Sequence, residues 1–278
     1  MRVFLWIFAL MIVFPNAKIN LGLSVLNKRK DGYHNLESIF LPVPFFDSLE
    51  FIESNKLSFE SSIEIDDEKS NSILQAYQFI KEIKDIPPVS IYVHKNIPIG
   101  AGLGGGSADG AFMLNGLNDY FNLDLSVEQL EKLALKIGSD CPFFIQNKPK
   151  LVHGTGDILS DITISLSGYY IAVINPKIHV STKMTFSNLK LKKNRNSDLK
   201  NVVNSTPISE WKNSIFNDFE PSIFKQYPSI ESLKNQCYKL GAIYSSMSGT
   251  GSTVYGVFEK EIDLSSFNSD YFVQGFQL

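Results

Sequence analysis

The chain has 278 residues, of which 44% are hydrophobic and 20% charged, and its formal net charge at pH 7 is −3. This composition predicts a folded protein with one large or two smaller cores, and it excludes disordered and fibrous proteins. The charge gives no basic surface of the kind that binds a nucleic-acid backbone, so we expect no nucleic-acid partner. The two cysteines, Cys141 and Cys237, have neither metal-type spacing nor the density of a secreted disulfide scaffold, which favours a cytoplasmic protein.

The N-terminus carries one arginine followed by an unbroken apolar run up to Phe14. This run is shorter than the roughly 20 apolar residues of a membrane span, so we expect no membrane partner. A signal peptide fits the length, but cleavage after Ala17 would leave Lys18 at the new amino terminus and destroy the first motif described below. We therefore expect residues 1–10 to be a start-site extension or an added edge strand.

A strand and a polar loop are predicted next. Residues 13–26 alternate apolar and polar side chains, which places Lys18 and Asn20 together on one exposed polar face. An Asp-Gly turn breaks the pattern, and its loop carries Tyr33 and His34.

The other elements follow from apolar spacing and from capping residues. Ser126 and Gln129 form a capping box for a helix that Gly138 ends. Helices are also predicted at 71–84, 108–120, around Trp211 and at 229–240, and strands at 89–93, 169–174, 242–247 and 253–258. Because the pattern changes near Gly156, we expect domains at 11–155 and 156–278, the second including a basic stretch at 183–200.

The segment at residues 98–107 is a glycine-rich loop before a helix. Residues without a Cβ atom let backbone N–H groups converge on an anion at a helix N-terminus, which suits a polyphosphate. Gly100, Gly102 and Gly105 also match the G-x-G-x-x-G pattern of dinucleotide-binding proteins. However, Asp124, the acid about twenty residues further on, precedes a helix instead of ending a strand. The Gly-Lys-Ser/Thr ending of a Walker A loop is absent as well.

Several motifs resemble one family. Residues 98–109, Pro-x-Gly-Ala-Gly-Leu-Gly-Gly-Gly-Ser-Ala-Asp, resemble the phosphate-binding motif of the galactokinase, homoserine kinase, mevalonate kinase and phosphomevalonate kinase (GHMP) superfamily. Residues 247–252 resemble its third motif, a second glycine-rich loop close to the phosphates. Within the superfamily, residues 15–21, 28–34 and 137–144 are similar to the diphosphocytidyl-methylerythritol kinases. The resemblance covers about residues 11 to 258.

This resemblance implies an α+β protein with the two-domain GHMP kinase fold, in which ATP and substrate lie in the interdomain cleft. It implies ATP- and Mg²⁺-dependent phosphorylation of the 2-hydroxyl of 4-diphosphocytidyl-2-C-methyl-D-erythritol, a step of the non-mevalonate isoprenoid pathway. The partner would be this small-molecule substrate, and the enzyme a monomer or weak homodimer.

The resemblance also implies roles for single residues. Asp140 would accept the hydroxyl proton, and Lys18 would keep Asp140 ionised and orient it. The residues expected at ATP are Asn71, Lys95, Pro98, Gly100, Gly102, Leu103, Gly104, Gly105, Gly106, Ser107, Gly249, Thr250, Gly251 and Ser252. The residues expected at the substrate are Asn20, Tyr33, His34, Thr182 and Phe186, with Tyr33 and Phe186 on the two faces of the cytosine ring. No residue is singled out as a ligand of the metal.

Other readings of these residues stay open. The alternative role is a helix cap for Asn71, a turn acid for Asp140 and a solvated strand lysine for Lys18. Ser107 and Ser252 fit plain turn positions. The alternative functions are a sibling kinase acting on mevalonate or homoserine, a dinucleotide-binding oxidoreductase, and a nucleotide-binding protein without catalysis.

Overall fold

The computed structural model describes residues 10–64, 70–187, 189 and 198–278. The expected extension at 1–10, apart from its last residue, and most of the stretch 188–197 lie outside the described residues. Two compact units are present: unit 1 holds 10–16, Phe45–Ile97 and Gly105–Gln146, and unit 2 holds Ala17–Pro44, Pro98–Gly104 and Asn147–Leu278. The expected domains, 11–155 and 156–278, differ from these units because the chain enters unit 2 three times.

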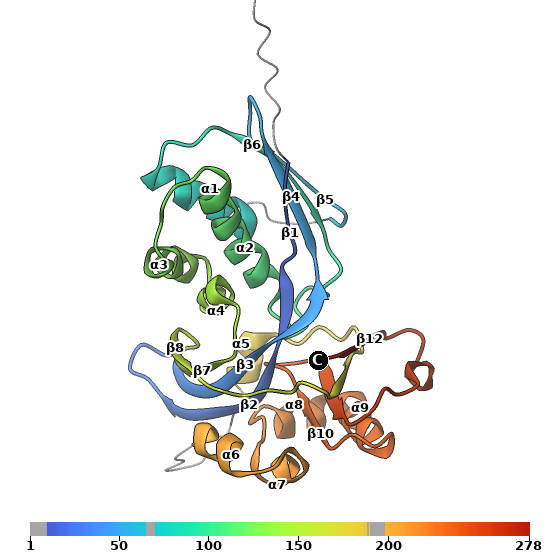
Figure 1. The fold of residues 1–278 in the computed structure, drawn as a ribbon. Coiled ribbons are helices and arrows are strands. Elements are labelled where there is room, and N and C mark those ends of the chain that lie inside the picture. Colours follow the sequence, from blue (N-terminus) through green and yellow to red (C-terminus); the bar gives the residue numbers. More distant parts are fainter. Residues whose placement is uncertain (1–9, 65–69, 188, 190–197) are drawn as a thin grey trace, which may run out of the picture. The chain divides into compact units, whose positions relative to one another are not determined.

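Unit 1 contains a sheet with helices on one side (Figure 1). Across the sheet the strands are β1 (Met11–Val13), β4 (Ser48–Glu53), β6 (Val89–His94) and β5 (Ser58–Ser61). The pairs β1–β4 and β4–β6 are antiparallel, and β5–β6 is parallel. The helices are α1 (Ser72–Ile83), α2 (Gly105–Tyr120), α3 (Val127–Ile137) and α4 (Cys141–Gln146).

Local signals account for the ends of these helices. The Asn71 side chain caps α1 by accepting hydrogen bonds from the backbone N–H groups of Ile73 and Leu74. The predicted capping box starts α3, and Gly138 is its C-cap. The helix predicted at 108–120 starts earlier, because the last glycines of the glycine-rich segment form the first turn of α2.

Unit 2 contains two further sheets. The first has the order β2 (Asn16–Lys28), β3 (His34–Phe46), β7 (Lys150–Gly154) and β8 (Ile158–Asp161). The second has the order β10 (Tyr244–Met247), β11 (Val254–Phe258), β9 (Tyr170–Asn175) and β12 (Phe272–Gln277). The helical elements are α5 (Thr182–Ser187), α6 (Leu199–Ser205), η2 (Ile208–Glu210), α7 (Trp211–Ser214), α8 (Glu220–Gln226), α9 (Pro228–Lys239) and η3 (Leu264–Ser266). The expected α+β class is confirmed.

The strand predicted at 13–26 differs from the structure in two ways. It is interrupted at Phe14 and Pro15, so that β1 pairs in unit 1 while β2 starts at Asn16. Its polar face is also buried: Lys18 is 3% and Asn20 2% exposed. The expected exposure was wrong because the first ten residues of β2 are covered on both faces, which alternation alone does not reveal.

The strands predicted at 242–247 and 253–258 are confirmed, and they form a hairpin. Strands β10 and β11 pair antiparallel from Tyr244↔Val257 to Met247↔Val254, so residues 248–253 form their connecting loop. Helix α9 packs against both strands. Its buried residues Ile230, Leu233 and Cys237 belong to the core of unit 2. The second glycine-rich loop therefore lies between two strands fixed by a core.

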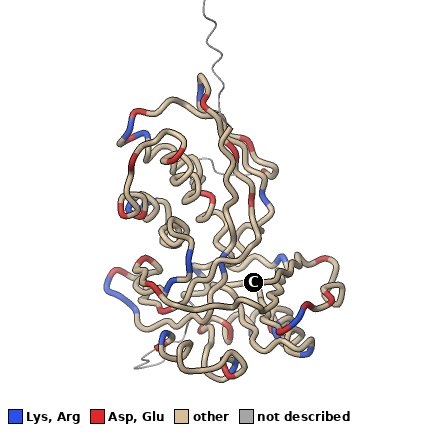
Figure 2. Tube along the Cα trace, in the orientation of Figure 1, with Lys and Arg blue, Asp and Glu red and all other residues tan. Residues whose placement is uncertain are grey.

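The charged residues are distributed along both units. Figure 2 shows Lys and Arg interspersed with Asp and Glu, with a basic group at the turn between β2 and β3. None of the helices in the described residues has the length and apolar character needed to span a bilayer.

Candidate functional site

The first glycine-rich loop, residues 98–104 of unit 2, is anchored by its non-glycine residues. Ala101 and Leu103 are buried, and their carbonyl groups accept hydrogen bonds from the backbone N–H groups of Thr253 (3.3 Å) and Lys18 (2.8 Å). Between them, Gly102 has a φ of +80°, in the left-handed region that side chains other than glycine avoid. The buried residues thus fix the loop while its glycines turn the backbone.

The second glycine-rich loop packs directly on the first. The Ser248 hydroxyl donates to the carbonyl of Gly102 at 2.7 Å. A Cβ atom on Gly102 would overlap the carbonyl of Ser248. The two backbones are therefore closer together than any residue with a side chain at position 102 would allow. The Asn217 amide donates to the carbonyls of Met247 and Gly249, both at 2.8 Å. Two loops far apart in the sequence are therefore joined inside unit 2.

Two predicted residues of the second loop have different surroundings. The Ser252 hydroxyl is fully buried, donates to the carbonyl of Ile178 at 2.6 Å and accepts from the Asn175 amide at 3.3 Å. These bonds support the turn role left open for Ser252. Thr250, in contrast, is not buried, and its hydroxyl lies 3.2 Å from that of Thr182 at the start of α5.

Lys18 and Asn20 do share one face of β2. The Lys18 ammonium donates to the side-chain oxygen of Asn20 at 2.6 Å and lies 4.3 Å from the centroid of the Phe40 ring. The Asn20 amide in turn donates to the Ser38 hydroxyl at 2.9 Å. A lysine buried in this way has a fixed position, so the solvated-lysine reading is wrong.

In unit 1, the first turn of α2 carries Gly105, Gly106 and Ser107. A Cβ atom on Gly106 would have no neighbour within 4 Å, and this turn contains no acidic side chain. The N-terminus of a 16-residue helix has a partial positive charge and unpaired N–H groups, which favour an anion. The Ser72 hydroxyl, next to Asn71, donates to the carbonyl of Gly106 at 2.5 Å. The cap of α1 is thereby connected to this turn.

Asp140 lies in the turn between Gly138 and the start of α4, and it is half-buried. The next residue, Cys141, is hydrogen-bonded to the Ser107 side chain. Burial, more than the nearby Asp140 charge, raises the pKa of the Cys141 thiol to about 12, so this thiol is neutral at pH 7. Within unit 1, Asp140 and Ser107 thus flank the same buried cysteine.

The residues predicted at the cytosine ring form a partial aromatic stack. The His34 ring stacks on Phe186 with centroids 5.2 Å apart, and Phe186 contacts Phe219 edge-on at 4.8 Å. Burial, and to a smaller degree the charge of Lys28, lowers the pKa of His34, which favours the neutral imidazole with one donor and one acceptor nitrogen. Tyr33 is 66% exposed. Of the three rings predicted at the cytosine, those of Phe186 and His34 are therefore in contact, whereas Tyr33 is exposed.

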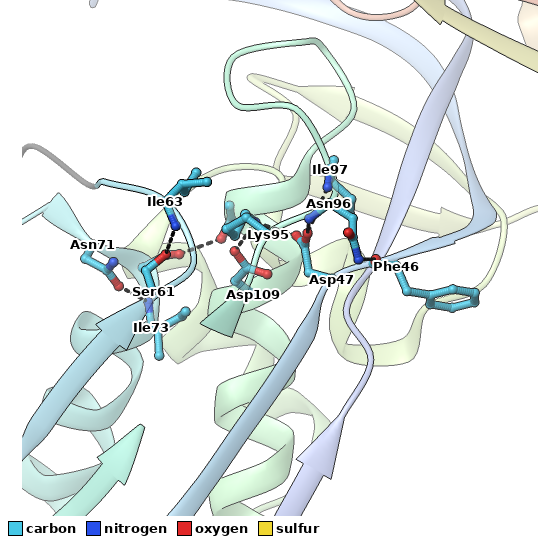
Figure 3. Close-up of polar contacts among 12 residues, drawn as sticks. Phe46, Asp47, Ser61, Ile63, Asn71, Ile73, Lys95, Asn96, Ile97 and Asp109 are labelled. Atoms are coloured by element: carbon cyan, nitrogen blue, oxygen red, sulfur yellow. Dashed lines mark hydrogen bonds and ion pairs between the residues drawn. The ribbon is translucent and has the colours of Figure 1, made fainter. Parts of the chain in front are cut away.

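Lys95 lies in a buried charge cluster that sequence reasoning missed (Figure 3). Its ammonium is paired with carboxylate oxygens of Asp47 and of Asp109, the latter at 2.5 Å. The three side chains are 5%, 0% and 5% exposed for Lys95, Asp47 and Asp109. The helical and strand periodicity of the sequence does not indicate this cluster, because its three residues come from three different segments.

The cluster predicts a pH dependence of stability. Burial, reinforced by the Asp47 charge and opposed by Lys95, raises the pKa of Asp109 to about 7. The folded protein then holds a proton that the unfolded carboxyl, with a pKa near 4, has released. The free energy of unfolding should therefore fall as the pH rises from about 4 to about 7. The unfolding equilibrium constant should rise over the same interval, by at most about tenfold per pH unit.

Urea unfolding of the wild-type and Asp109→Asn proteins at pH 5, 6 and 7 measures this dependence. The variant, which cannot release a proton at this position, should lose less stability than the wild type over the same interval. Parallel pH profiles for the two proteins would contradict the prediction.

A second missed group holds the β10–β11 loop. Asn217 is 2% exposed, and its side-chain oxygen accepts the N–H of Phe219 at 3.0 Å. Glu220 accepts from the backbone N–H of Met247 at 2.9 Å and is paired with Lys234 at 2.6 Å. Both residues follow an irregular segment, where no local pattern marks them.

Among residues 10–64, 70–187, 189 and 198–278, no group of three or more His, Cys, Asp or Glu side chains could hold a metal ion. A magnesium ion held mainly by nucleotide phosphates and water needs no such group.

Two family models match the chain. Residues 71–148 match the model of the GHMP kinases N terminal domain, and residues 199–267 match that of the GHMP kinases C terminal domain. The matched segments fall on either side of residues 155 and 156.

Two relatives and one solved structure are similar to this chain over most of its length. A 4-diphosphocytidyl-2-C-methyl-D-erythritol kinase of Bacteroides fragilis is 50% identical over 257 residues, which are 90% of this chain and 93% of the relative. One of Cytophaga hutchinsonii is 49% identical over 253 residues, 89% of this chain and 92% of the relative. A crystal structure of 4-(cytidine 5'-diphospho)-2C-methyl-D-erythritol kinase matches with a TM-score of 0.75 and 26% identity, over 89% of this chain and 90% of that one.

Proposed function

Because the chain belongs to the 4-diphosphocytidyl-2-C-methyl-D-erythritol kinases of the GHMP superfamily, we propose that it transfers the γ-phosphate of ATP to the 2-hydroxyl of 4-diphosphocytidyl-2-C-methyl-D-erythritol. The observation that carries the proposal is the packing of the second glycine-rich loop on Gly102 of the first. Two such loops packed together suit a polyphosphate.

The residues present fit ATP as phosphate donor. The glycines of the first loop have left-handed backbone conformations, and Gly106 leaves open space where a side chain would otherwise stand. We assign the phosphates to this loop and to the α2 N-terminus. Mg²⁺ would enter with ATP, since this ion is usually held by one or two carboxylates, water and substrate phosphates. The interdomain location of ATP and substrate stays a prediction.

The transfer step needs little covalent chemistry from the protein. It requires alignment of the hydroxyl with the γ-phosphate, donors for the developing charge, and an acceptor for the hydroxyl proton. We assign the proton to Asp140, a half-buried carboxylate on a short turn, and its electrostatic support to Lys18, whose position on β2 is fixed by Asn20. General-base assistance of this kind contributes about 10²–10⁴-fold to the rate.

Recognition of the cytidine group is assigned to the loop before β3 and to α5. The neutral His34 ring offers a donor and an acceptor to the edge of a base, and Phe186 offers a flat surface beside it. Tyr33 is exposed and free to cover the other face of the base. A kinase for mevalonate or homoserine would have no use for these rings. This feature favours the cytidine substrate over both alternatives.

The product identifies the reaction. Purified protein, MgATP and the cytidine diphosphate substrate should give a species heavier by one phosphoryl group, with a new phosphomonoester signal in the ³¹P NMR spectrum coupled to carbon 2 of the erythritol. A phosphate on another hydroxyl would refute the assigned position. If no phosphorylated product forms, reduction of NAD in a parallel reaction that contains NAD would favour the oxidoreductase alternative.

The Phe186→Ala variant tests the cytosine assignment. Base stacking on an aromatic ring is worth roughly 1–3 kcal/mol, so KM for the cytidine substrate should rise by about tenfold. The KM for MgATP and kcat should change much less, because the ring is not assigned to the nucleotide phosphates or to the proton. Steady-state kinetics with each substrate varied in turn measures both constants.

A matched control is Phe276→Ala, which removes a half-buried phenylalanine from strand β12 outside the assigned site. It should leave both KM values unchanged. An unchanged KM for the cytidine substrate in Phe186→Ala, or an equal rise for MgATP, would exclude Phe186 from base recognition.

A further inference from the structure

The carboxylate–lysine cluster of Asp47, Lys95 and Asp109 involves the segments just before and just after the first glycine-rich loop. One oxygen of Asp47 accepts the backbone N–H groups of Asn96 (2.6 Å) and Ile97 (2.8 Å), the last residues before the loop (Figure 3). The other oxygen binds the Lys95 ammonium. Asp47 therefore fixes the backbone at the entrance of the loop.

The same ammonium reaches the exit of the loop. Lys95 donates to Asp109 at 2.5 Å, and Asp109 is the fifth residue of α2, which starts where the loop ends. Through one lysine, the strand that leads into the loop is joined to the helix that leads out of it. All three residues belong to unit 1.

A second contact joins the two ends independently of charge. A Cβ atom placed on Gly105 would lie 2.8 Å from the Cγ2 atom of Ile97 and 3.1 Å from its Cβ atom. The backbone at the start of α2 is thus pressed against the Ile97 side chain. The entrance and exit of the loop are held together both by an apolar contact and by the ion pairs.

Burial makes this arrangement specific. Buried charges are tolerated only when they are paired with opposite charges in good geometry. A displacement of one side chain of the cluster would therefore leave another buried charge without its partner. Among the described residues, one oxygen of Asp109, Oδ1, has no hydrogen-bond partner although it is buried. The folded protein thus retains the free-energy cost of a buried oxygen without a hydrogen bond. At binding sites, residues retained at such a cost often position the groups around them.

We propose that Asp47 and Asp109, joined by Lys95, are positioning residues that fix both ends of the first glycine-rich loop and thereby set the affinity of the enzyme for MgATP. This inference rests on the proposed function, because it takes the loop as the phosphate site. The residues act through the backbone of the loop, so their loss should raise KM for MgATP more than it lowers kcat.

The test compares Asp109→Leu with Asp109→Asn. Leucine has the same number of side-chain heavy atoms and the same branching as aspartate but cannot bind Lys95, whereas asparagine keeps an oxygen for the ammonium and resembles the protonated carboxyl. Asp85→Asn, an exposed carboxyl of unit 1, is the matched control. Two quantities are measured: amide hydrogen exchange of residues 96–106 without nucleotide, and the steady-state constants for MgATP.

We expect Asp109→Leu to accelerate exchange of the Asn96 and Ile97 amides by at least about tenfold, since 1.4 kcal/mol of lost local protection corresponds to tenfold. It should raise KM for MgATP by about fivefold or more, with kcat within about twofold of wild type. Asp109→Asn should restore both values to near those of the wild type. A fall in kcat with unchanged KM, or exchange equal to that of the wild type, would overturn the proposal.

Asp47→Asn serves as the second variant if Asp109→Leu does not fold. Its amide group would face the Lys95 ammonium, so the same loss of protection is expected, and unchanged exchange would again overturn the proposal. Because exchange is measured without nucleotide, it tests the cluster even in a protein without turnover. Absence of kinase activity in the wild type would count against the proposed function, whereas unchanged exchange in the variants counts against the cluster alone.

Discussion

Asp140→Asn is expected to lower kcat by about 10²–10⁴-fold, the range that general-base assistance contributes. Asparagine has nearly the same shape as aspartate but cannot accept the proton of the substrate hydroxyl. The KM values for MgATP and for the cytidine substrate should change little, because the turn between Gly138 and α4 keeps its backbone. Single-turnover measurements with pre-bound substrates isolate the transfer step from product release.

The control for this variant is Asp119→Asn, the same change at an exposed carboxyl near the end of α2 in the same unit. It should retain wild-type kcat. Near-normal turnover in Asp140→Asn would remove Asp140 from the role of base. A large rise in either KM with a modest loss of kcat would instead make it a binding residue.

Gly102→Ala is expected to disable the phosphate site through the backbone. The residue has a φ of +80°, which costs an alanine about 1–2 kcal/mol, and its Cβ atom would overlap the Ser248 carbonyl of the second loop. Overpacking of this kind costs a further 1–3 kcal/mol or so and displaces the backbone. We expect KM for MgATP to rise more than about tenfold and the urea midpoint to fall.

Gly241→Ala separates the two effects. Gly241 also has a positive φ, +95°, but a Cβ atom there would have no neighbour within 4 Å. This control should lose only the stability associated with the left-handed backbone, and KM for MgATP should stay as in the wild type. If Gly102→Ala behaved like the control in both respects, close packing of the two loops would have no part in nucleotide binding.

Features encoded within a few residues could be predicted from the sequence. Asn71, Ser126 and Gly138 mark helix ends because each capping bond is made to a neighbour in the chain. The hairpin around residues 248–253 follows from two alternating strands and a glycine-rich turn. The motifs of the two loops also indicated the GHMP superfamily, which the two family models then confirmed.

Features that depend on distant segments could not be predicted. The alternation in β2 shows that Lys18 and Asn20 share a face, but whether that face is buried depends on the elements that cover it. The Asp47–Lys95–Asp109 cluster joins three segments of unit 1, and no periodicity connects them. The contact of Phe186 with His34 likewise arises only when α5 is folded against the start of β3.

The most direct test is release of ADP in a coupled assay with MgATP and four acceptors in turn. These are the cytidine diphosphate substrate, methylerythritol phosphate without cytidine, mevalonate and homoserine. Turnover with the first acceptor alone is expected, since the rings of His34 and Phe186 are assigned to the base. Turnover with mevalonate or homoserine, and none with the cytidine substrate, would contradict the proposed function while leaving the kinase fold intact.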